Sequence, residues 1–270
     1  MKQLIDYYSA YDEWGRLDRE PLEYLVNMHH IRGNLPESGR ILDNGAGPGK
    51  YSVELAKAGY RVTLADLTPR LVETAERKAE EEGVRERFDG FHALDARDLS
   101  GLPDENFDAA LMLGPLYHLQ EERDRRQAVG ELHRVTKPGG IVFVAFMPRT
   151  AFLRTSLERP LNWKPNHTAA GLDKMLDTGA FEHEDEGRFT GAYYFDIDDI
   201  RPFMEEQGFE SVKLIASASL AGSMDAEQWD YWRGRGEEEF AAVMRRVIQV
   251  SESPYILGTS SHLLYIGRRK

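Results

Sequence analysis

The 270-residue chain carries a formal net charge of -12, and 41% of its residues are hydrophobic, a composition typical of a folded enzyme-sized protein. It contains no cysteine, so disulfides, thiolate metal sites and a cysteine nucleophile are excluded. No run reaches the roughly 18–20 apolar residues of a membrane span, and the first residues lack the apolar segment of a secretory signal. We therefore expect a cytoplasmic protein without a membrane partner. The acidic balance also disfavours a nucleic-acid partner, because phosphate contacts use Lys and Arg.

The first part of the chain has the residue spacing of a helix. Within residues 1–35, Leu22, Leu25 and Val26 recur at helical positions, and Pro21 suits a first helical turn. Strand and helix patterns then alternate. Strands are expected over residues 40–45, 60–67, 91–94, 107–113 and 141–147. Helices are expected over 50–59 and 69–83, and residues 122–140 are expected to form a helix that runs into a turn. Strands separated by helices of this length predict parallel βαβ crossovers.

The rhythm breaks after Met147 and resumes with a helix over 196–208, a strand over 210–217 and a last strand over 262–269. The sequence thus predicts an α/β fold with a doubly wound, mostly parallel seven-stranded sheet and helices on both faces. We divide the chain into an N-terminal helical cap (1–35), a core (36–147), a lid insertion (148–192), a continuation of the core (193–218), a second insertion (219–258) and a final core strand (259–270). Both insertions are expected to form a lid over the acceptor.

A glycine-rich turn, Asp43-x-Gly45-x-Gly47-x-Gly49, follows the first predicted strand. A turn between strand and helix lies at the carboxyl edge of a parallel sheet, where open α/β folds bind ligands. The dinucleotide fingerprint Gly-x-Gly-x-x-Gly fails, because Lys50 stands where its third glycine belongs. A phosphate loop fails as well, since no Gly-Lys-Ser/Thr follows at its spacing.

Further elements follow this turn in order. They are an acidic strand end at Asp66, the pair Asp95-Ala96 after the third strand, FDAALMLGPLYHL over 107–119, and VTKPGGIVFVAF over 135–146. Together with the turn they resemble the motifs of class I (Rossmann-like) S-adenosylmethionine-dependent methyltransferases. The resemblance covers about residues 38–147 and points to the branch that acts on small molecules, as in ubiquinone and menaquinone biosynthesis.

The resemblance implies roles for individual residues. Asp66 would accept hydrogen bonds from both ribose hydroxyls, Asp95 from the adenine amino group, and the Leu113 carbonyl from the donor's amino group. Asp43 would either contact the donor or cap the N–H groups of its own loop. The implied cofactor-binding set comprises Asp43, Gly45, Ala46, Gly47, Gly49, Asp66, Leu67, Asp95, Ala96, Leu113 and Gly114, with Tyr11 and Arg16 reaching the donor's carboxylate. An acidic rim suits a sulfonium cation that carries no phosphate.

The methyl group would point toward the LGPLYHL segment. His118 is a candidate general base, because imidazole titrates near neutral pH, and Tyr117 is a second candidate catalytic residue. Packing at a helix start is the alternative role for His118, since positioning alone supplies much of the acceleration of a methyl transfer. The insertions and the last strand offer polar rings for an acceptor pocket: Trp163, His167, Tyr193, Tyr194, Trp229, Trp232, Tyr255 and His262. No metal site is implied.

The sequence therefore predicts an S-adenosylmethionine-dependent methyltransferase that acts on an oxygen, nitrogen or sulfur atom of a small molecule and releases S-adenosylhomocysteine. Three alternatives stay open: an RNA or tRNA methyltransferase, a non-catalytic sensor of the same ligand, and a nicotinamide-dependent oxidoreductase, against which Lys50 argues. We expect a monomer or a homodimer.

Overall fold

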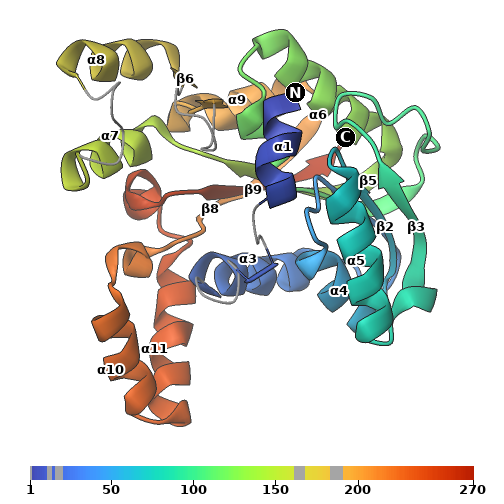
Figure 1. The fold of residues 1–270 in the computed structure, drawn as a ribbon, viewed down its shortest axis with the longest axis horizontal. Coiled ribbons are helices and arrows are strands. Elements are labelled where there is room, and N and C mark those ends of the chain that lie inside the picture. Colours follow the sequence, from blue (N-terminus) through green and yellow to red (C-terminus); the bar gives the residue numbers. More distant parts are fainter. Residues whose placement is uncertain (1, 11–13, 16–20, 161–167, 183–190) are drawn as a thin grey trace.

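A seven-stranded sheet forms the centre of the computed structural model, which describes residues 2–10, 14–15, 21–160, 168–182 and 191–270 (Figure 1). The strands lie in the order β3-β2-β1-β4-β5-β9-β8. They span Arg40–Asn44 (β1), Arg61–Asp66 (β2), Phe88–Ala93 (β3), Phe107–Met112 (β4), Thr136–Phe146 (β5), Phe209–Ala216 (β8) and Leu263–Arg269 (β9). Strand β9 runs antiparallel to both of its neighbours, β5 and β8, whereas the other pairs in this sheet are parallel. The predicted mostly parallel, doubly wound sheet is confirmed.

Helices cover both faces of this sheet. One face carries α3 (Pro21–Asn34), α4 (Lys50–Lys57) and α5 (Pro69–Glu81), and the other carries α6 (Glu122–Val135) and α9 (Ile197–Glu206). Alternate strand residues feed the two cores: Ile41 packs with α3 and α4, whereas its neighbour Leu42 packs with α6. This period of two is the reason that each parallel strand reads as a continuous apolar run.

Two strands begin earlier than the sequence pattern predicts. Strand β5 starts at Thr136 rather than Ile141, because Thr136 pairs with Phe107 before the register of the two strands shifts. Gly139 adopts φ 75° within this segment, so the Pro-Gly-Gly run lies inside an irregular strand and not in a turn. Strand β3 starts at Phe88 rather than Phe91.

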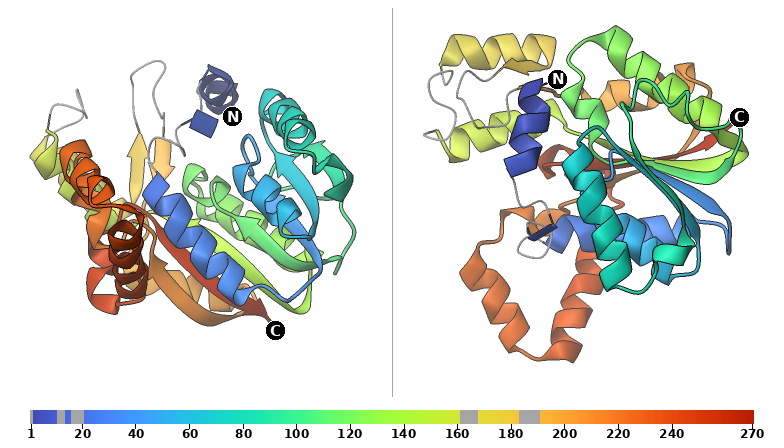
Figure 2. Two further views of the ribbon diagram at one scale, coloured as in Figure 1. Left: turned by 90° about the horizontal axis from the view of Figure 1, so that it is seen from below. Right: turned by 45° about the vertical axis from the view of Figure 1, so that its right-hand side comes forward.

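The additions to the core lie around one side of the sheet (Figure 2). At the N-terminus, α1 (Lys2–Ala10) stands beside α5. After β5 come α7 (Arg149–Glu158), α8 (Ala169–Thr178) and a small hairpin of β6 (Ala180–Glu182) and β7 (Gly191–Tyr193). A hairpin of α10 (Ala226–Gly234) and α11 (Glu237–Val250) projects away from the sheet between the short helices η3 (Leu220–Ser223) and η4 (Pro254–Thr259). The six-part division of the chain stays a prediction.

Candidate functional site

A cavity of about 590 Å³ opens at the carboxyl ends of the parallel strands. Its wall contains Asp43 of β1, Asp66 of β2, and Asp95, Leu113 and Met147, which follow β3, β4 and β5. Residues far apart in the sequence therefore meet at one edge of the sheet, as expected for an open α/β fold. The volume lies in the range of roughly 300–1,000 Å³ that is usual for small-molecule sites.

The glycine turn forms one wall of the cavity. Gly45, Gly47 and Gly49 have φ values of 75°, 57° and 84°, which favour glycine. Gly45, Ala46 and Gly47 line the cavity, but Gly49 does not. A Cβ atom on Gly49 would lie 2.9 Å from both the Ala75 Cβ and a Leu64 methyl carbon. Gly49 therefore allows α4 to begin against the core, and the structure places it outside the wall.

Asp66 is held by the two turns that flank it. One carboxylate oxygen accepts the Gly47 N–H at 2.8 Å, and the other accepts the Thr68 N–H at 2.8 Å. A carboxylate has about four lone-pair positions, so these bonds fix its orientation without using its full accepting capacity. Asp66 and the adjacent Leu67 both line the cavity, so a carboxylate of fixed orientation faces it. Its contact with the ribose stays a prediction.

Asp43 lies deeper at the end of β1. The Ser52 hydroxyl donates a 2.6 Å hydrogen bond to it. Burial raises the pKa of Asp43 to about 7, and the nearby charge of Asp66 acts in the same direction. Asp43 lines the cavity and also ties the end of β1 to α4 through Ser52. Its contact with the donor and its capping of the loop N–H groups both stay predictions.

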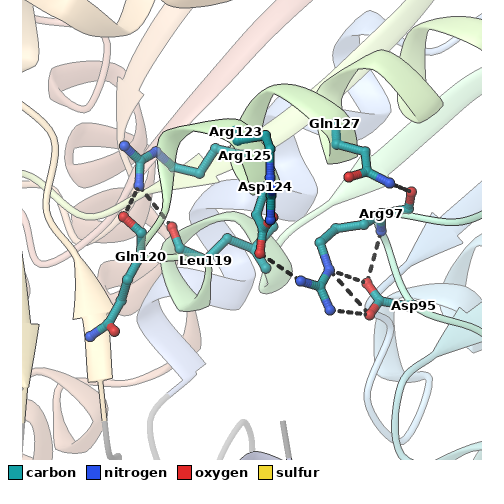
Figure 3. Close-up of polar contacts among 8 residues, drawn as sticks. All are labelled: Asp95, Arg97, Leu119, Gln120, Arg123, Asp124, Arg125 and Gln127. Carbon is teal, nitrogen blue, oxygen red and sulfur yellow. Dashed lines mark hydrogen bonds and ion pairs between the residues drawn. The ribbon is translucent and has the colours of Figure 1, made fainter.

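Asp95 is paired with Arg97 (Figure 3). The guanidinium donates to both oxygens of Asp95, with distances of 2.7 Å from Nη2 and 3.0 Å from Nε, and its Nη1 donates to Asp124 of α6 at 2.6 Å. The Arg97 hydrogen bonds outweigh burial and hold the pKa of Asp95 below its usual range. Asp95, Ala96, Arg97 and Asp124 all line the cavity.

The other end of the cavity is aromatic. The Tyr117 hydroxyl donates to the Leu113 carbonyl at 3.3 Å, and the Tyr8 hydroxyl lies 3.0 Å from His118 Nε2. Burial lowers the pKa of His118 to about 3, with a smaller contribution from the charge of His262. His118 is therefore neutral near pH 7. The catalytic roles of Tyr117 and His118 stay predictions, although both side chains and Gly114 line the cavity.

Several wall residues carry no sequence motif. They include Tyr7 and Tyr8 of α1, Glu23 of α3, Lys50, Arg97, Asp124 and Met147. The Lys50 ammonium lies 5.6 Å from the ring centres of both Trp14 and Tyr24. Among these wall residues, only Arg97 has a sequence signal, because it lies two positions after Asp95. The other residues reach the cavity because separate helices and strands pack together.

The ring-bearing residues proposed for an acceptor pocket mostly lie elsewhere. Trp163 and His167 lie outside the described residues, and among the other six only His262 lines the cavity. Tyr193 packs under the Arg125 guanidinium at 3.4 Å, and Tyr194 is buried against Phe152. Trp229, Trp232 and Tyr255 belong to the 219–258 segment, whose α10–α11 hairpin projects away from the sheet (Figure 1). None of the described residues of this segment lines the cavity, and its expected role as a lid stays a prediction.

Tyr11 and Arg16, the candidates for the donor's carboxylate, lie outside the described residues. Within the described ranges, no group of three His, Asp or Glu side chains has a geometry for holding a metal ion, and the expected absence of a metal stays a prediction. No described helix is both long and apolar enough to cross a membrane.

The charge of the wall distinguishes between classes of ligand. Among the described residues, six carboxyl side chains line the cavity, against two basic side chains, Lys50 and Arg97. The carboxylates are Glu23, Asp43, Asp66, Asp95, Glu121 and Asp124. This excess of acceptors fits a nucleoside that carries a sulfonium cation, and it would oppose a pyrophosphate.

Comparisons with known proteins agree with this geometry. Residues 41–140 match the family model of a methyltransferase domain. The chain is 36% identical over 138 residues to ubiquinone biosynthesis O-methyltransferase from Methylocella silvestris, covering 49% of this chain and 50% of that protein. It is 29% identical over 113 residues to tRNA 5-carboxymethoxyuridine methyltransferase from Escherichia coli, covering 41% of each. The chain thus spans about half the length, or less, of these curated relatives.

Solved structures share the fold. An S-adenosylmethionine-dependent methyltransferase from Methanosarcina mazei superposes with a TM-score of 0.59 at 21% identity, covering 89% of this chain and 96% of that one. A 1,6-didemethyltoxoflavin-N1-methyltransferase from Burkholderia thailandensis, solved with S-adenosylhomocysteine, gives 0.60 at 14% identity, covering 100% of this chain and 88% of the other. The chain has the class I, Rossmann-like methyltransferase fold. Residues 41–140 are the part of the chain that resembles a methyltransferase domain.

Proposed function

We propose that this protein is an S-adenosylmethionine-dependent methyltransferase that methylates an oxygen atom of a small molecule. The observation that carries the proposal is the convergence of Asp43, Asp66, Asp95 and the glycine turn on one cavity that continues past Leu113 into an aromatic end. The O-methyltransferase relative favours oxygen over nitrogen or sulfur as the accepting atom.

In this proposal the turn residues Gly45–Gly47 and Asp66 hold the ribose side of the donor, and Asp95 and Ala96 hold its adenine. The Leu113 carbonyl, which accepts the Tyr117 hydroxyl, also faces the donor's amino group. When bound, S-adenosylmethionine supplies an electrophilic methyl group on a sulfonium. The chain's contribution is to hold an acceptor beside Gly114 in line with that methyl, and such positioning is worth up to roughly 7–11 kcal/mol.

The acceptor occupies the end of the cavity formed by Tyr8, Tyr117 and His118. The buried, neutral His118 is a weak base, so its proposed part is to hold the Tyr8 hydroxyl and the shape of the pocket. The cytoplasmic location, the monomeric or homodimeric state and the absence of nucleic-acid and membrane partners stay predictions.

A tRNA substrate is the second candidate, because one relative is a tRNA methyltransferase. The net charge of -12 argues against it, since nucleic-acid binding draws on Lys and Arg. A non-catalytic sensor would bind the donor without turnover.

The test measures S-adenosylhomocysteine release with panels of small hydroxyl, amine and thiol acceptors and with bulk tRNA at two salt concentrations. Release with a hydroxyl compound alone supports the proposal. Salt-sensitive release of S-adenosylhomocysteine with tRNA would favour a tRNA methyltransferase over the proposed function. Donor binding without any release would favour a non-catalytic sensor.

A further inference from the structure

His262 and Glu23 meet at the aromatic end of the cavity, although they lie 239 positions apart in the sequence. His262 immediately precedes β9, and the antiparallel pairing of Leu263 with Phe146 places it beside the end of β5, where Met147 lines the cavity. Glu23 lies in the first turn of α3. The reversed direction of β9 is therefore what brings an imidazole to the edge where the parallel strands end.

The two side chains are close enough to act together. His262 Nδ1 lies 3.1 Å from Glu23 Oε2, at ion-pair distance, and each side chain is 22% exposed. A carboxylate beside one imidazole nitrogen orients the ring and stabilises the imidazolium, which leaves Nε2 as the nitrogen that takes up a proton. Partial exposure gives that proton a path to solvent.

The neighbouring histidine has a different environment. His118 is buried, it lies beside the Tyr8 hydroxyl, and the charge of His262 lowers its pKa further. The Tyr117 ring stands between the two histidines, with its centre 4.9 Å from that of His118 and 5.5 Å from that of His262. Among the described residues, Glu23, Tyr117 and His118 face His262, and Glu23 is the carboxylate of this group.

Resting on the proposed function, we infer that His262 and Glu23 form a proton-accepting pair for an acceptor that carries a phenolic hydroxyl. The rings of Tyr7, Tyr8 and Tyr117, with the thioether of Met147, give this end of the cavity the flat apolar walls that suit an aromatic ring.

The step balances as follows. The acceptor's O–H proton passes to His262 Nε2, the oxygen forms its bond to the methyl carbon, and the broken carbon–sulfur bond leaves its electron pair on sulfur as the donor becomes S-adenosylhomocysteine. Glu23 carries the countercharge of the imidazolium until the proton leaves to water. A phenol suits this pair because its proton is acidic enough for an imidazole to remove.

The test uses 4-nitrocatechol, whose phenolate has its own visible absorption, bound to the full chain saturated with S-adenosylhomocysteine. The wild type is expected to lower the apparent ionisation midpoint of the bound probe by at least about one pH unit, which is a tenfold change in the proton equilibrium. His262→Gln is expected to abolish this shift and Glu23→Gln to reduce it. Calorimetric affinity for S-adenosylhomocysteine should be unchanged in both variants.

His29→Gln is the matched control, because this exposed histidine lies on the same helix as Glu23 and outside the cavity wall. Methyl transfer to the probe, where it is turned over, should fall by roughly 100-fold or more in His262→Gln, the usual contribution of a general base. The proposed proton-accepting role of His262 and Glu23 would be overturned if the probe stays neutral or fails to bind in the wild type. Equal phenolate fractions in all variants would overturn it as well. Failure of S-adenosylhomocysteine itself to bind would instead overturn the proposed function.

Discussion

The Arg97 guanidinium holds the Asp95 carboxylate through both of its oxygens and is itself anchored by Asp124 (Figure 3). Without this cation, two carboxylates would face each other across the cavity wall. The bridge, together with the Arg97 backbone N–H that also donates to Asp95, therefore keeps this carboxylate ionised and in one orientation.

Arg97→Gln should weaken S-adenosylhomocysteine binding by about tenfold, or about 1.4 kcal/mol, because Asp95 would lose its fixed orientation. The preference for S-adenosylhomocysteine over the 6-oxo analogue S-inosylhomocysteine should shrink in parallel, since only the former offers an amino group to Asp95. Calorimetry measures both ligands. Arg123→Gln is the control, because Arg123 is exposed and reaches only the outer oxygen of Asp124, at 3.5 Å. Equal affinities for wild type and Arg97→Gln would show that the bridge serves stability alone.

Gly47→Val should abolish detectable donor binding while the protein still folds. A branched side chain at φ 57° would project from the turn that lines the cavity and would disturb the N–H that holds Asp66. Gly83→Ala provides the comparison: it has a similar φ of 69° and open space around it, but it lies at the end of α5 away from the cavity. It should cost about 1 kcal/mol of stability and leave affinity intact. Retained binding in Gly47→Val would mean that the turn does not approach the donor.

Gly49→Ala should lower the free energy of unfolding by about 1–3 kcal/mol, because its Cβ would lie 2.9 Å from Ala75 and Leu64 at a φ of 84°. The affinity of the folded protein for S-adenosylhomocysteine should change little, since Gly49 lies outside the cavity wall. Urea unfolding and calorimetry on the same preparation separate the two effects. A large loss of affinity with unchanged stability would return Gly49 to the binding set.

The buried His30, which lies outside the cavity, should make the free energy of unfolding depend on pH in the acid range. Burial lowers the pKa of His30 to about 4, and its Nε2 lies 2.9 Å from the Ser251 hydroxyl. Between pH 6.5 and about 4 the unfolded chain takes up a proton that the folded chain does not, so the free energy of unfolding falls as the pH falls. This contribution is on the order of 3 kcal/mol over that range.

His30→Gln should remove that part of the pH dependence and flatten the curve of unfolding free energy against pH between 4 and 6.5. Urea titrations at several pH values measure it, and the difference from the wild type cancels the contribution of the carboxylates. Parallel curves for the two proteins would show that His30 takes up its proton as readily in the folded chain as in the unfolded chain, which would contradict the lowered pKa.

The core was predictable because its signals are local. Parallel strands buried on both faces give apolar runs, and each run ends in the residue that reaches the sheet edge, as at Asp43 and Asp66. The start of β5 was missed because Pro138 and Gly139, which usually mark a turn, lie in an irregular part of the strand.

The aromatic end was only partly predictable because it depends on tertiary packing. His262 was one of eight candidate rings, and what selects it is the antiparallel direction of β9, which the apolar pattern of that strand does not encode. Glu23 and Tyr8 lie on helices whose docking brings them to the cavity. The outward direction of the α10–α11 hairpin is likewise set by how its ends join the sheet.

Calorimetric titration of S-adenosylhomocysteine into wild type and Asp66→Ala tests the central claim most directly. Asp66 is buried and fixed by the Gly47 and Thr68 N–H groups, and we propose that it accepts the ribose hydroxyls. The wild type should bind with a dissociation constant below about 1 mM, and Asp66→Ala should bind at least about 100-fold more weakly, since hydrogen bonds to a charged group contribute roughly 1.5–3 kcal/mol each. Absence of binding in the wild type, or equal affinity in a folded Asp66→Ala, would contradict a methyl-donor site at this edge of the sheet.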